Sequence, residues 1–396
     1  MRESNTDKIH CTGCSACASA CPKQCISMEA DTEGFWYPKI EQKSCVNCGV
    51  CEKVCPVLHK RESASESPLA YAAFHPDEAV RLESSSGGMF SLLAAEMIRR
   101  GGVVFGAAFD SRLNAEHSYS KTEADLKRFR GSKYVQSRIG PSYEEARCFL
   151  ESGRPVLFSG TPCQIAGLKS FLGKEYEGLI CQDVVCHGVP SSKVWRKYLD
   201  FQQSAEQSKV EQAFFRDKTH GWVDFSLSLE FQNGKEHVQT LDSDLYMRAF
   251  LRNLSLRPSC YNCAFKMPYG QSDITLADFW GIRTVDAEMF DDRGVSLVLT
   301  HTEKGKCFFF QAAKEAVFRE EDWRQALRFN PAAHRSAALP ANRRAFFEKL
   351  DTEDFKALVS KYAAVPLREK IERAVKSRAK TALKRIGLSG AARKRK

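Results

Sequence analysis

The middle of the chain alternates short apolar runs with longer amphipathic segments. Apolar runs bounded by turn residues predict buried strands, and apolar residues that recur every three to four positions predict helices. The strands that we expect cover residues 103–109, 156–159, 179–185, 274–277 and 295–300, and the helices cover residues 86–100, 144–151, 162–172 and 191–201. Strands that alternate with helices in this way favour parallel pairing in βαβ units.

Two regions depart from this alternation. Residues 210–231 alternate with a period of two, which predicts an antiparallel ribbon. Beyond Glu303 the pattern is mostly helical. We therefore expect an α/β catalytic domain with a mixed sheet over residues 69–335, followed by a helical extension over residues 336–396.

The predicted extension ends in a basic tail. Residues 366–396 contain twelve Lys and Arg against two Glu, whereas the rest of the chain has forty-seven charges of each sign. The net charge of +10 therefore belongs to the tail, and a nucleic-acid-binding protein is disfavoured. Apolar residues recur at helical spacing from Leu367 to Ile386. Peripheral contact of this helix with an anionic membrane is one hypothesis, and a solvated or partner-binding tail is the alternative.

The first ten residues lack the apolar run of a secretory signal, and no run reaches the roughly 18 apolar residues of a membrane-spanning helix. We therefore expect a cytoplasmic protein, with membrane-peripheral placement as the variant. Sixteen cysteines in a reducing compartment favour metal ligation over disulfide bonds.

The first sixty residues contain two copies of one cysteine motif, C-x2-C-x2-C-x3-C-P. In bacterial two-cluster proteins, the fourth cysteine of each motif ligates the cluster of the other motif. The first predicted 4Fe-4S cluster is held by Cys11, Cys14, Cys17 and Cys55, and the second by Cys45, Cys48, Cys51 and Cys21. Zinc is the alternative metal, but zinc ribbons use paired CxxC knuckles rather than this three-plus-one run.

We expect residues 1–60 to form a small α+β domain resembling bacterial ferredoxins. Residues 61–68 are polar, rich in serine and closed by a proline, which predicts a linker. Cys25 lies outside the doubled motif and is predicted to be an ordinary thiol near a cluster.

The remaining seven cysteines divide into two groups. We interpret Cys148, Cys181 and Cys307 as small buried hydrophobic residues. The other four, at the ends of predicted elements, are Cys163, Cys186, Cys260 and Cys263. Strand ends of a parallel sheet gather at one edge, so these four thiolates could close a third 4Fe-4S cluster. Zinc held by the same cysteines and a set of unrelated thiols are the alternatives.

Several short motifs together resemble one known family. They are Ser86-Gly87-Gly88, Gly131-Ser132-Lys133-Tyr134-Val135, the turn from Ser159 to Cys163, Cys186-His187-Gly188, the pair Cys260 and Cys263, and Asp278-Phe279-Trp280-Gly281. Over residues 8–335 this combination resembles the coenzyme F420 hydrogenase/dehydrogenase beta-subunit family. The resemblance implies FAD beside a 4Fe-4S cluster that is held by cysteines of the catalytic domain. It also makes coenzyme F420 a candidate cofactor, although the family includes pigment reductases and many bacterial members without an assigned substrate.

Candidate flavin-binding residues follow from this resemblance. The run Ser86, Gly87 and Gly88 precedes an apolar helix, whose free amides could bind a phosphate of FAD. An ordinary serine cap with glycines needed for packing is the alternative. Lys133 could stabilise reduced flavin or a phosphate, or could be a solvated surface charge. No G-x-G-x-x-G run follows a strand, so a Rossmann nicotinamide site is not supported.

Two candidate catalytic residues complete the predicted site. His187 follows a proposed cluster ligand and could donate protons near the flavin, or hydrogen-bond a cluster sulfur. Asp278, at a predicted strand end, could be a proton donor or a ribose contact, or the N-cap of the next element.

Two main functions are compatible with these features. In the first, the chain is an iron–sulfur flavoprotein oxidoreductase that takes electrons from a ferredoxin-type donor, passes them through 4Fe-4S clusters to FAD and reduces an organic acceptor, or runs in reverse. Polysaccharide biosynthesis is one context for such a reaction. In the second, it is a non-catalytic electron-transfer subunit that serves a partner oxidoreductase. A true coenzyme F420-reducing subunit is a further alternative.

Overall fold

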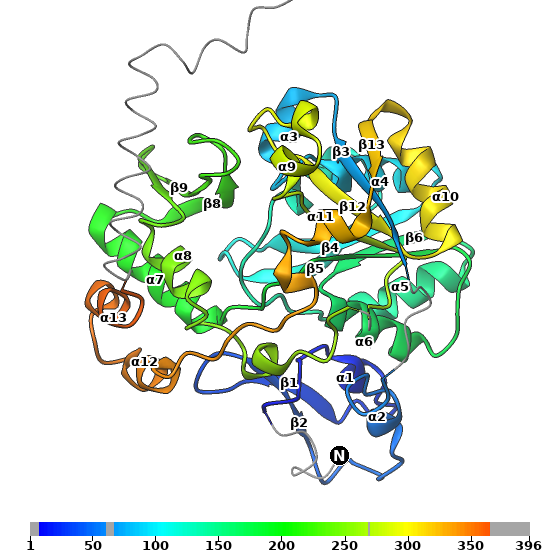
Figure 1. The fold of residues 1–396 in the computed structure, drawn as a ribbon. Helices are drawn as coiled ribbons and strands as arrows, with labels where there is room; N and C mark the ends of the chain where they lie inside the picture. The colour runs from blue at the N-terminus through cyan, green and yellow to red at the C-terminus, as the bar shows by residue number, and fades with distance from the viewer. Residues whose placement is uncertain (1–7, 61–66, 268–269, 365–396) are drawn as a thin grey trace, which may run out of the picture.

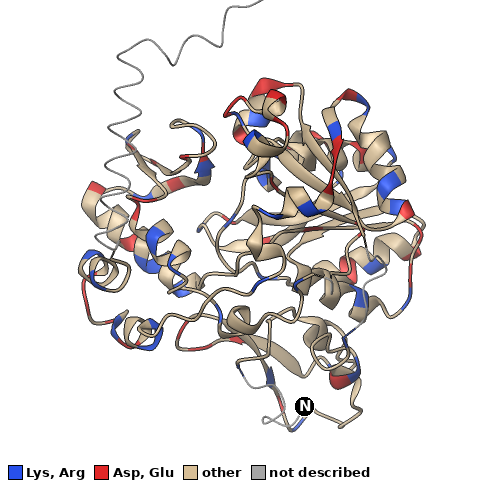
Figure 2. Ribbon diagram, in the orientation of Figure 1, with Lys and Arg blue, Asp and Glu red and all other residues tan. Residues whose placement is uncertain are grey.

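The computed structural model describes residues 8–60, 67–267 and 270–364 (Figure 1). The predicted basic tail from residue 366 onward and most of the predicted linker lie outside the described residues. None of the described helices combines the length and apolarity that a membrane crossing requires. Acidic and basic residues are interspersed over the described chain, which agrees with a body of balanced charge (Figure 2).

Eight strands of the described chain form one mixed sheet in the larger domain. They are β3 (Leu69–Phe74), β4 (Val103–Phe109), β5 (Ala115–Ser120), β6 (Val156–Gly160), β7 (Leu179–Val184), β11 (Ile274–Asp278), β12 (Ser296–Thr300) and β13 (Val317–Glu321). Their order is β13-β3-β12-β11-β7-β6-β4-β5. The central strands β11, β7, β6 and β4 pair in parallel, and the outer pairs are antiparallel. The predicted α/β domain with a mixed sheet is confirmed.

Helices cover both faces of this sheet. The main ones are α4 (Met89–Arg99), α5 (Ser142–Glu151), α6 (Pro162–Leu172) and α10 (Glu303–Ala312). Val104 and Leu157 pack with α4 and α10 on one face, whereas Val103 and Val156 pack with α5 and α6 on the other. This alternation arises because successive side chains of a strand point to opposite faces. Shorter helices are α3 (Glu78–Glu83), α9 (Ile282–Val285) and α11 (Trp323–Leu327), with 3-10 turns η1 (Ala124–Phe129), η2 (Pro258–Asn262), η3 (Ala287–Met289), η4 (Ala313–Glu315) and η5 (Pro331–Ala333).

A second sheet of the described chain lies beside the first. Its antiparallel strands are β8 (Val210–Asp217), β9 (Ser226–Phe231) and β10 (Glu236–Thr240), in the order β10-β9-β8. This confirms the predicted ribbon and adds a third strand. Four helices share its core: α7 (Ser192–Glu206), α8 (Leu245–Leu251), α12 (Arg343–Lys349) and α13 (Phe355–Tyr362). The described part of the C-terminal extension therefore packs on this second sheet.

The N-terminal region is a small ferredoxin-like unit built on a β-hairpin. It contains α1 (Ala16–Ser19), the antiparallel strands β1 (Ile26–Ala30) and β2 (Trp36–Ile40), and α2 (Val50–Lys53). It lies below the larger domain in the view of Figure 1, with α1 against α6.

Several sequence interpretations need correction. Cys148 and Cys307 are exposed rather than buried, and only Cys181 of that group is in the core. The buried residues of α5 include Ala146 and Leu150, and Cys148 lies two positions from each, on the opposite side of the helix. The strands β3, β5 and β13 were not expected. In β13 the sequence VFREE has too few apolar residues for a period of two to appear.

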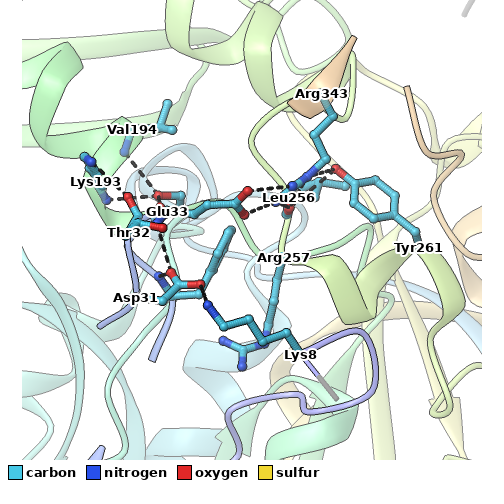
Figure 3. Close-up of polar contacts among 12 residues, drawn as sticks. Lys8, Asp31, Thr32, Glu33, Lys193, Val194, Leu256, Arg257, Tyr261 and Arg343 are labelled. Atoms are coloured by element: carbon cyan, nitrogen blue, oxygen red, sulfur yellow. Dashed lines mark hydrogen bonds and ion pairs between the residues drawn. The ribbon is translucent and has the colours of Figure 1, made fainter. Parts of the chain in front are cut away.

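Polar contacts join the ferredoxin-like unit to the larger domain (Figure 3). Arg343 binds both carboxylate oxygens of Glu33, with its Nη1 atom 3.0 Å from Oε1. At the start of α7, the Ser192 hydroxyl donates to the carbonyl of Gly34 at 2.7 Å, and the Lys193 amine donates to the carbonyl of Thr32 at 2.8 Å. A bidentate ion pair and backbone contacts fix the orientation of the hairpin loop.

We expect one added methyl group at Gly34, where the hairpin loop meets α7, to destabilise the protein. Gly34 has φ +85°, and a Cβ added there would lie 2.5 Å from the Cβ of Lys193. Gly153 has a similar φ of +80°, but an added Cβ meets no described atom within 4 Å. Gly34→Ala should therefore lower the free energy of unfolding by about 1–3 kcal/mol more than Gly153→Ala does. Urea unfolding measures both, and equal losses would contradict the predicted role of this contact.

Candidate functional site

The eight cysteines of the doubled motif line two separate cavities in the ferredoxin-like unit. One cavity is lined by Cys11, Cys14, Cys17 and Cys55, and the other by Cys21, Cys45, Cys48 and Cys51. The fourth cysteine of each motif thus lies with the first three of the other, as the spacing predicts. Cys25 also lines the second cavity, with its Sγ atom 3.4 Å from that of Cys21.

The four cysteines of the predicted third set line one small cavity of about 60 Å³ in the larger domain. Cys163 is the second residue of α6, whose first turn is closed by a capping box between Thr161 and Gln164. Cys186 lies in the loop after β7. The Val189 amide of this loop donates to the Sγ atom of Cys260 at 3.4 Å, and Cys263 follows at the end of η2. A helix start, a strand end and a 3-10 turn therefore bring together residues that are far apart in the sequence.

The electrostatics of this cavity reflect buried thiols that lie close together. Burial raises the pKa of Cys163 to about 12, with further contributions from Cys263 and Cys260. Burial also raises the pKa of Cys260 to about 11 and that of Cys186 strongly. Four such thiols would repel one another as thiolates, and bound iron would supply the compensating positive charge.

The spacing of the cysteines also bears on the choice between zinc and a cluster. Within residues 8–60, 67–267 and 270–364, no three His, Cys, Asp or Glu side chains converge closely enough to hold a single metal ion. This applies equally to the doubled motif in the N-terminal unit. Zinc draws four thiolates around one point, whereas a cubane carries them on four irons and holds them further apart. Four thiolate donors suit either kind of metal centre.

A larger cavity of about 670 Å³ adjoins the cysteine cavity, and Cys163 and Cys186 line both. Ser86, Gly88 and Lys133 also line the large cavity, as do His187 and Asp278. The predicted flavin and catalytic residues therefore lie around one space, with the exception of Gly87.

Gly87 serves the packing of the fold. A Cβ added at Gly87 would lie 2.4 Å from the carbonyl oxygen of Ala73 and 2.6 Å from the amide nitrogen of Ser296. The absence of a side chain thus lets the start of α4 approach β3 and β12. The next residue, Gly88, occupies the N-cap position of α4 with φ +87°. Glycine has no side chain that could accept hydrogen bonds from the first amides of the helix, so no capping side chain binds these amides beside the cavity.

Lys133 is held by backbone carbonyls rather than solvated. Its Nζ atom donates to the carbonyl oxygens of Arg128 at 2.9 Å and Arg130 at 2.8 Å, at the end of η1. Burial lowers the pKa of Lys133 to about 7, and the charge of Arg128 lowers it further. Lys133 thereby orders the loop that lines the cavity.

His187 has one ring nitrogen in use. Its Nε2 atom lies 2.7 Å from Oδ1 of Asn253, and the ring meets Phe250 edge to face. Burial lowers the pKa of His187, so the ring is neutral at neutral pH. With Nε2–H donating to Asn253, Nδ1 is left as an acceptor.

Asp278 is one half of a buried ion pair. Its two oxygens lie 2.7 and 2.8 Å from the guanidinium of Arg216, and the Trp222 indole donates to Oδ1 at 2.7 Å. Burial lowers the pKa of Arg216, but the Asp278 carboxylate outweighs this effect, and the net pKa is raised. Asp278 therefore fixes the position of the Arg216 guanidinium.

Sequence reasoning missed two residues of this cavity, Arg216 and His117. The Nε atom of Arg216 is buried and has no hydrogen-bond partner among the described residues, so it is free to bind a ligand. His117 lies 3.0 Å from both the Ser159 carbonyl and the Ser137 hydroxyl, and burial lowers its pKa to about 4. Arg216 is followed directly by Asp217 and Lys218, so the sequence around it gave no signal of a buried position.

The cavities of the two domains are neighbours. Thr12, next to a predicted cluster ligand, lines the first cysteine cavity of the N-terminal unit, the cysteine cavity of the larger domain and the large cavity. On α6, a Cβ added at Gly167 would lie 2.9 Å from the Cβ of Cys14. Gly167 is one helical turn after Cys163, so one face of α6 carries a cysteine of the third set and receives a cysteine of the first.

Residues 153–325 match the family model for the C terminus of the coenzyme F420 hydrogenase/dehydrogenase beta subunit. This region, less than half of the chain, resembles that family. The F420 hydrogenase/dehydrogenase-type region contains all four cysteines of the third set, together with His187, Arg216 and Asp278. Residues 10–58 match a 4Fe-4S dicluster domain. The chain therefore combines a 4Fe-4S dicluster domain with a region that matches this beta-subunit family.

Two similar proteins add detail. NADH-quinone oxidoreductase subunit I of Pelobacter propionicus is 35% identical over 57 residues, which cover 12% of this chain and 31% of that protein. The match thus spans less than a third of the relative. A chain in the structure of the F420-reducing NiFe hydrogenase complex from Methanosarcina barkeri, studied by xenon derivatization, has 17% identity and a TM-score of 0.45, over 75% of this chain and 92% of that chain.

We expect Asp278→Asn to destabilise the fold by about 3–5 kcal/mol, because it leaves Arg216 buried without its countercharge. The double variant Arg216→Met/Asp278→Leu should recover most of this loss, since it removes both charges. Glu348→Gln breaks an exposed pair with Arg344 and should leave stability unchanged. Denaturant unfolding tests all three, and a double variant as unstable as Asp278→Asn would contradict the ion-pair interpretation.

Proposed function

We propose that this chain is an iron–sulfur flavoprotein oxidoreductase with three 4Fe-4S clusters and one FAD. Electrons enter singly from a ferredoxin-type protein at the dicluster domain and leave in pairs to an organic acceptor, or the path runs in reverse. The observation that carries the proposal is the contact of Cys14 with α6, one turn from Cys163. It brings the first cluster site beside the third cysteine set, which in turn borders the large cavity.

The second cluster site is the proposed point of electron entry. Cys48 in that site is exposed, whereas Cys14 in the first site is buried. A protein partner can therefore approach the second site closely, while the first faces the larger domain. Entry at the second site, transfer to the first and exit toward the third follows this order of burial.

The large cavity is the proposed FAD site. Its walls offer uncapped amides at the start of α4 for a phosphate, and the unpartnered Nε atom of Arg216 for an acceptor atom of the flavin. When bound there, FAD supplies the step from single electrons to electron pairs, which clusters alone do not perform. Lys133 orders one wall, and Asp278 fixes the guanidinium of Arg216.

His187 is the proposed proton-handling residue. It lines both the cysteine cavity and the large cavity, and its ring is neutral. Asn253 fixes Nε2, which leaves Nδ1 available to accept a proton and return it. A neutral imidazole beside a cluster site can thus couple proton movement to electron arrival.

A second candidate is a subunit that conducts electrons to a partner enzyme, with coenzyme F420 as one acceptor. The matched family is described as a beta subunit, which favours this arrangement. Flavin content and activity of the isolated chain with artificial electron donors separate the two functions. Bound FAD with turnover of an organic acceptor supports the enzyme, whereas iron without flavin supports the conducting subunit.

The metal content provides a direct prediction. Protein purified without oxygen should contain about twelve irons and about one FAD per chain, since each cubane holds about four irons. Cys163→Ala and Cys263→Ala should each remove about four irons and leave the dicluster domain loaded. Cys307→Ala is the matched control, because this thiol is exposed on α10 and should not change the iron count. About eight irons in the wild type would remove the third cluster from the proposal, and zinc in place of iron would overturn it.

A further inference from the structure

Arg257 is a fully buried cation at the junction of the two domains. Its exposed fraction is 0%, and its side chain extends toward the ferredoxin-like unit (Figure 3). Its Nε atom donates to the carbonyl of Cys11 at 2.8 Å, and its Nη1 atom lies 3.3 Å from Oε1 of Gln136. Both acceptors are neutral, and the Nη2 atom has no hydrogen-bond partner in the described chain.

The neighbours of Arg257 belong to two cysteine sets. On the side of the first set, the Nη1 atom of Arg257 lies close to Gly13: a Cβ added at Gly13 would be 2.9 Å from this atom. On the side of the third set, the Cys260 amide donates to the carbonyl of Arg257 at 2.9 Å. The charge of Arg257 also lowers the pKa of both Cys163 and Cys260 against the larger effect of burial. One guanidinium therefore lies within electrostatic reach of both sites.

Such a position is costly unless an anion is nearby. A buried guanidinium normally has a carboxylate partner, as Arg343 has Glu33 and Arg216 has Asp278. The face of the Tyr37 ring, 4.0 Å from the Cζ atom of Arg257, offsets only part of this cost. A 4Fe-4S cluster with four thiolates is anionic and becomes more negative when reduced, so it can provide the missing countercharge.

We propose that Arg257 is the shared counter-ion of the first and third clusters and raises the reduction potential of both. For the first cluster the proposal rests on the dicluster domain alone, and for the third it rests on the proposed function. The reduced cluster gains more from a fixed positive charge than the oxidised cluster does, because it carries one more negative charge. Arg257 is thus a positioning and tuning residue, and it favours electron residence at the domain junction.

The test compares the reduction potentials of the clusters in four variants by redox titration followed with electron paramagnetic resonance. Arg257→Met removes the charge and should make reduction of the first and third clusters at least tenfold less favourable, about 59 mV per cluster for one electron. Arg257→Gln gives a second neutral variant. Arg257→Lys keeps the charge and should stay within threefold of the wild type.

Two controls distinguish tuning from a change in packing. Arg257 contacts Cys11, Gly13, Gln136 and Tyr37, and none of these residues lines the separate cavity of the second cluster site. The potential of the second cluster should therefore stay the same in every variant. Arg343→Met removes the neighbouring interdomain arginine, whose charge is already balanced by Glu33, and should leave all potentials within threefold. Iron content is measured alongside each titration.

Three results would overturn the proposal. They are unchanged potentials of the first cluster in fully loaded Arg257→Met and Arg257→Gln, an equal shift in Arg343→Met, or loss of iron in all three Arg257 variants, which would show a purely structural role. If the wild type contained only two clusters, the proposed third cluster would be wrong. The titration of the first cluster would still decide the role of Arg257.

Discussion

The contact of the first cysteine loop with α6 is the one on which the rest of the arrangement depends. The first cysteine loop reaches α6 at Gly167, where any side chain would collide with Cys14. The same helix presents Cys163 one turn earlier, at an end fixed by its capping box. A missing side chain at one helical position thus lets the two cysteine sets approach each other, as the proposed electron path requires. The polar joint around Glu33 then keeps the hairpin from rotating away from this contact.

The buried arginines at this junction and in the large cavity differ in their partners. Arg343 and Arg216 each have a carboxylate partner, so their charges are balanced within the chain. Such pairs contribute geometry more than stability, since burial offsets much of the attraction. The hydrogen-bond acceptors of Arg257 among the described residues are neutral, and in our proposal the clusters supply its countercharge. The partner therefore distinguishes Arg343 and Arg216, which stabilise the arrangement of the chain, from Arg257, which we propose interacts with the clusters.

Local patterns in the sequence were enough to predict part of this structure. The spacing of the doubled motif predicted which cysteines share a cavity, because three of each set lie on one short loop. Apolar periodicity located β4 and α6 at their observed bounds. It did not reveal β13, an edge strand rich in charge, and it placed Cys148 and Cys307 in the core, since a short apolar run does not say which side of a helix a residue occupies.

The long-range contacts of the site could not be predicted from the sequence, for a physical reason. Arg257 and Cys11 are 246 positions apart, and Arg216 and Asp278 are 62 apart. No local period links such residues, so the sequence pattern around each arginine does not reveal its partner. The cysteines differ in this respect, because a doubled three-plus-one cysteine motif is typical of two-cluster iron–sulfur proteins. Ligands of a metal cluster can therefore be inferred from residue type, whereas the charged residues that tune the cluster become visible when the fold brings them to it.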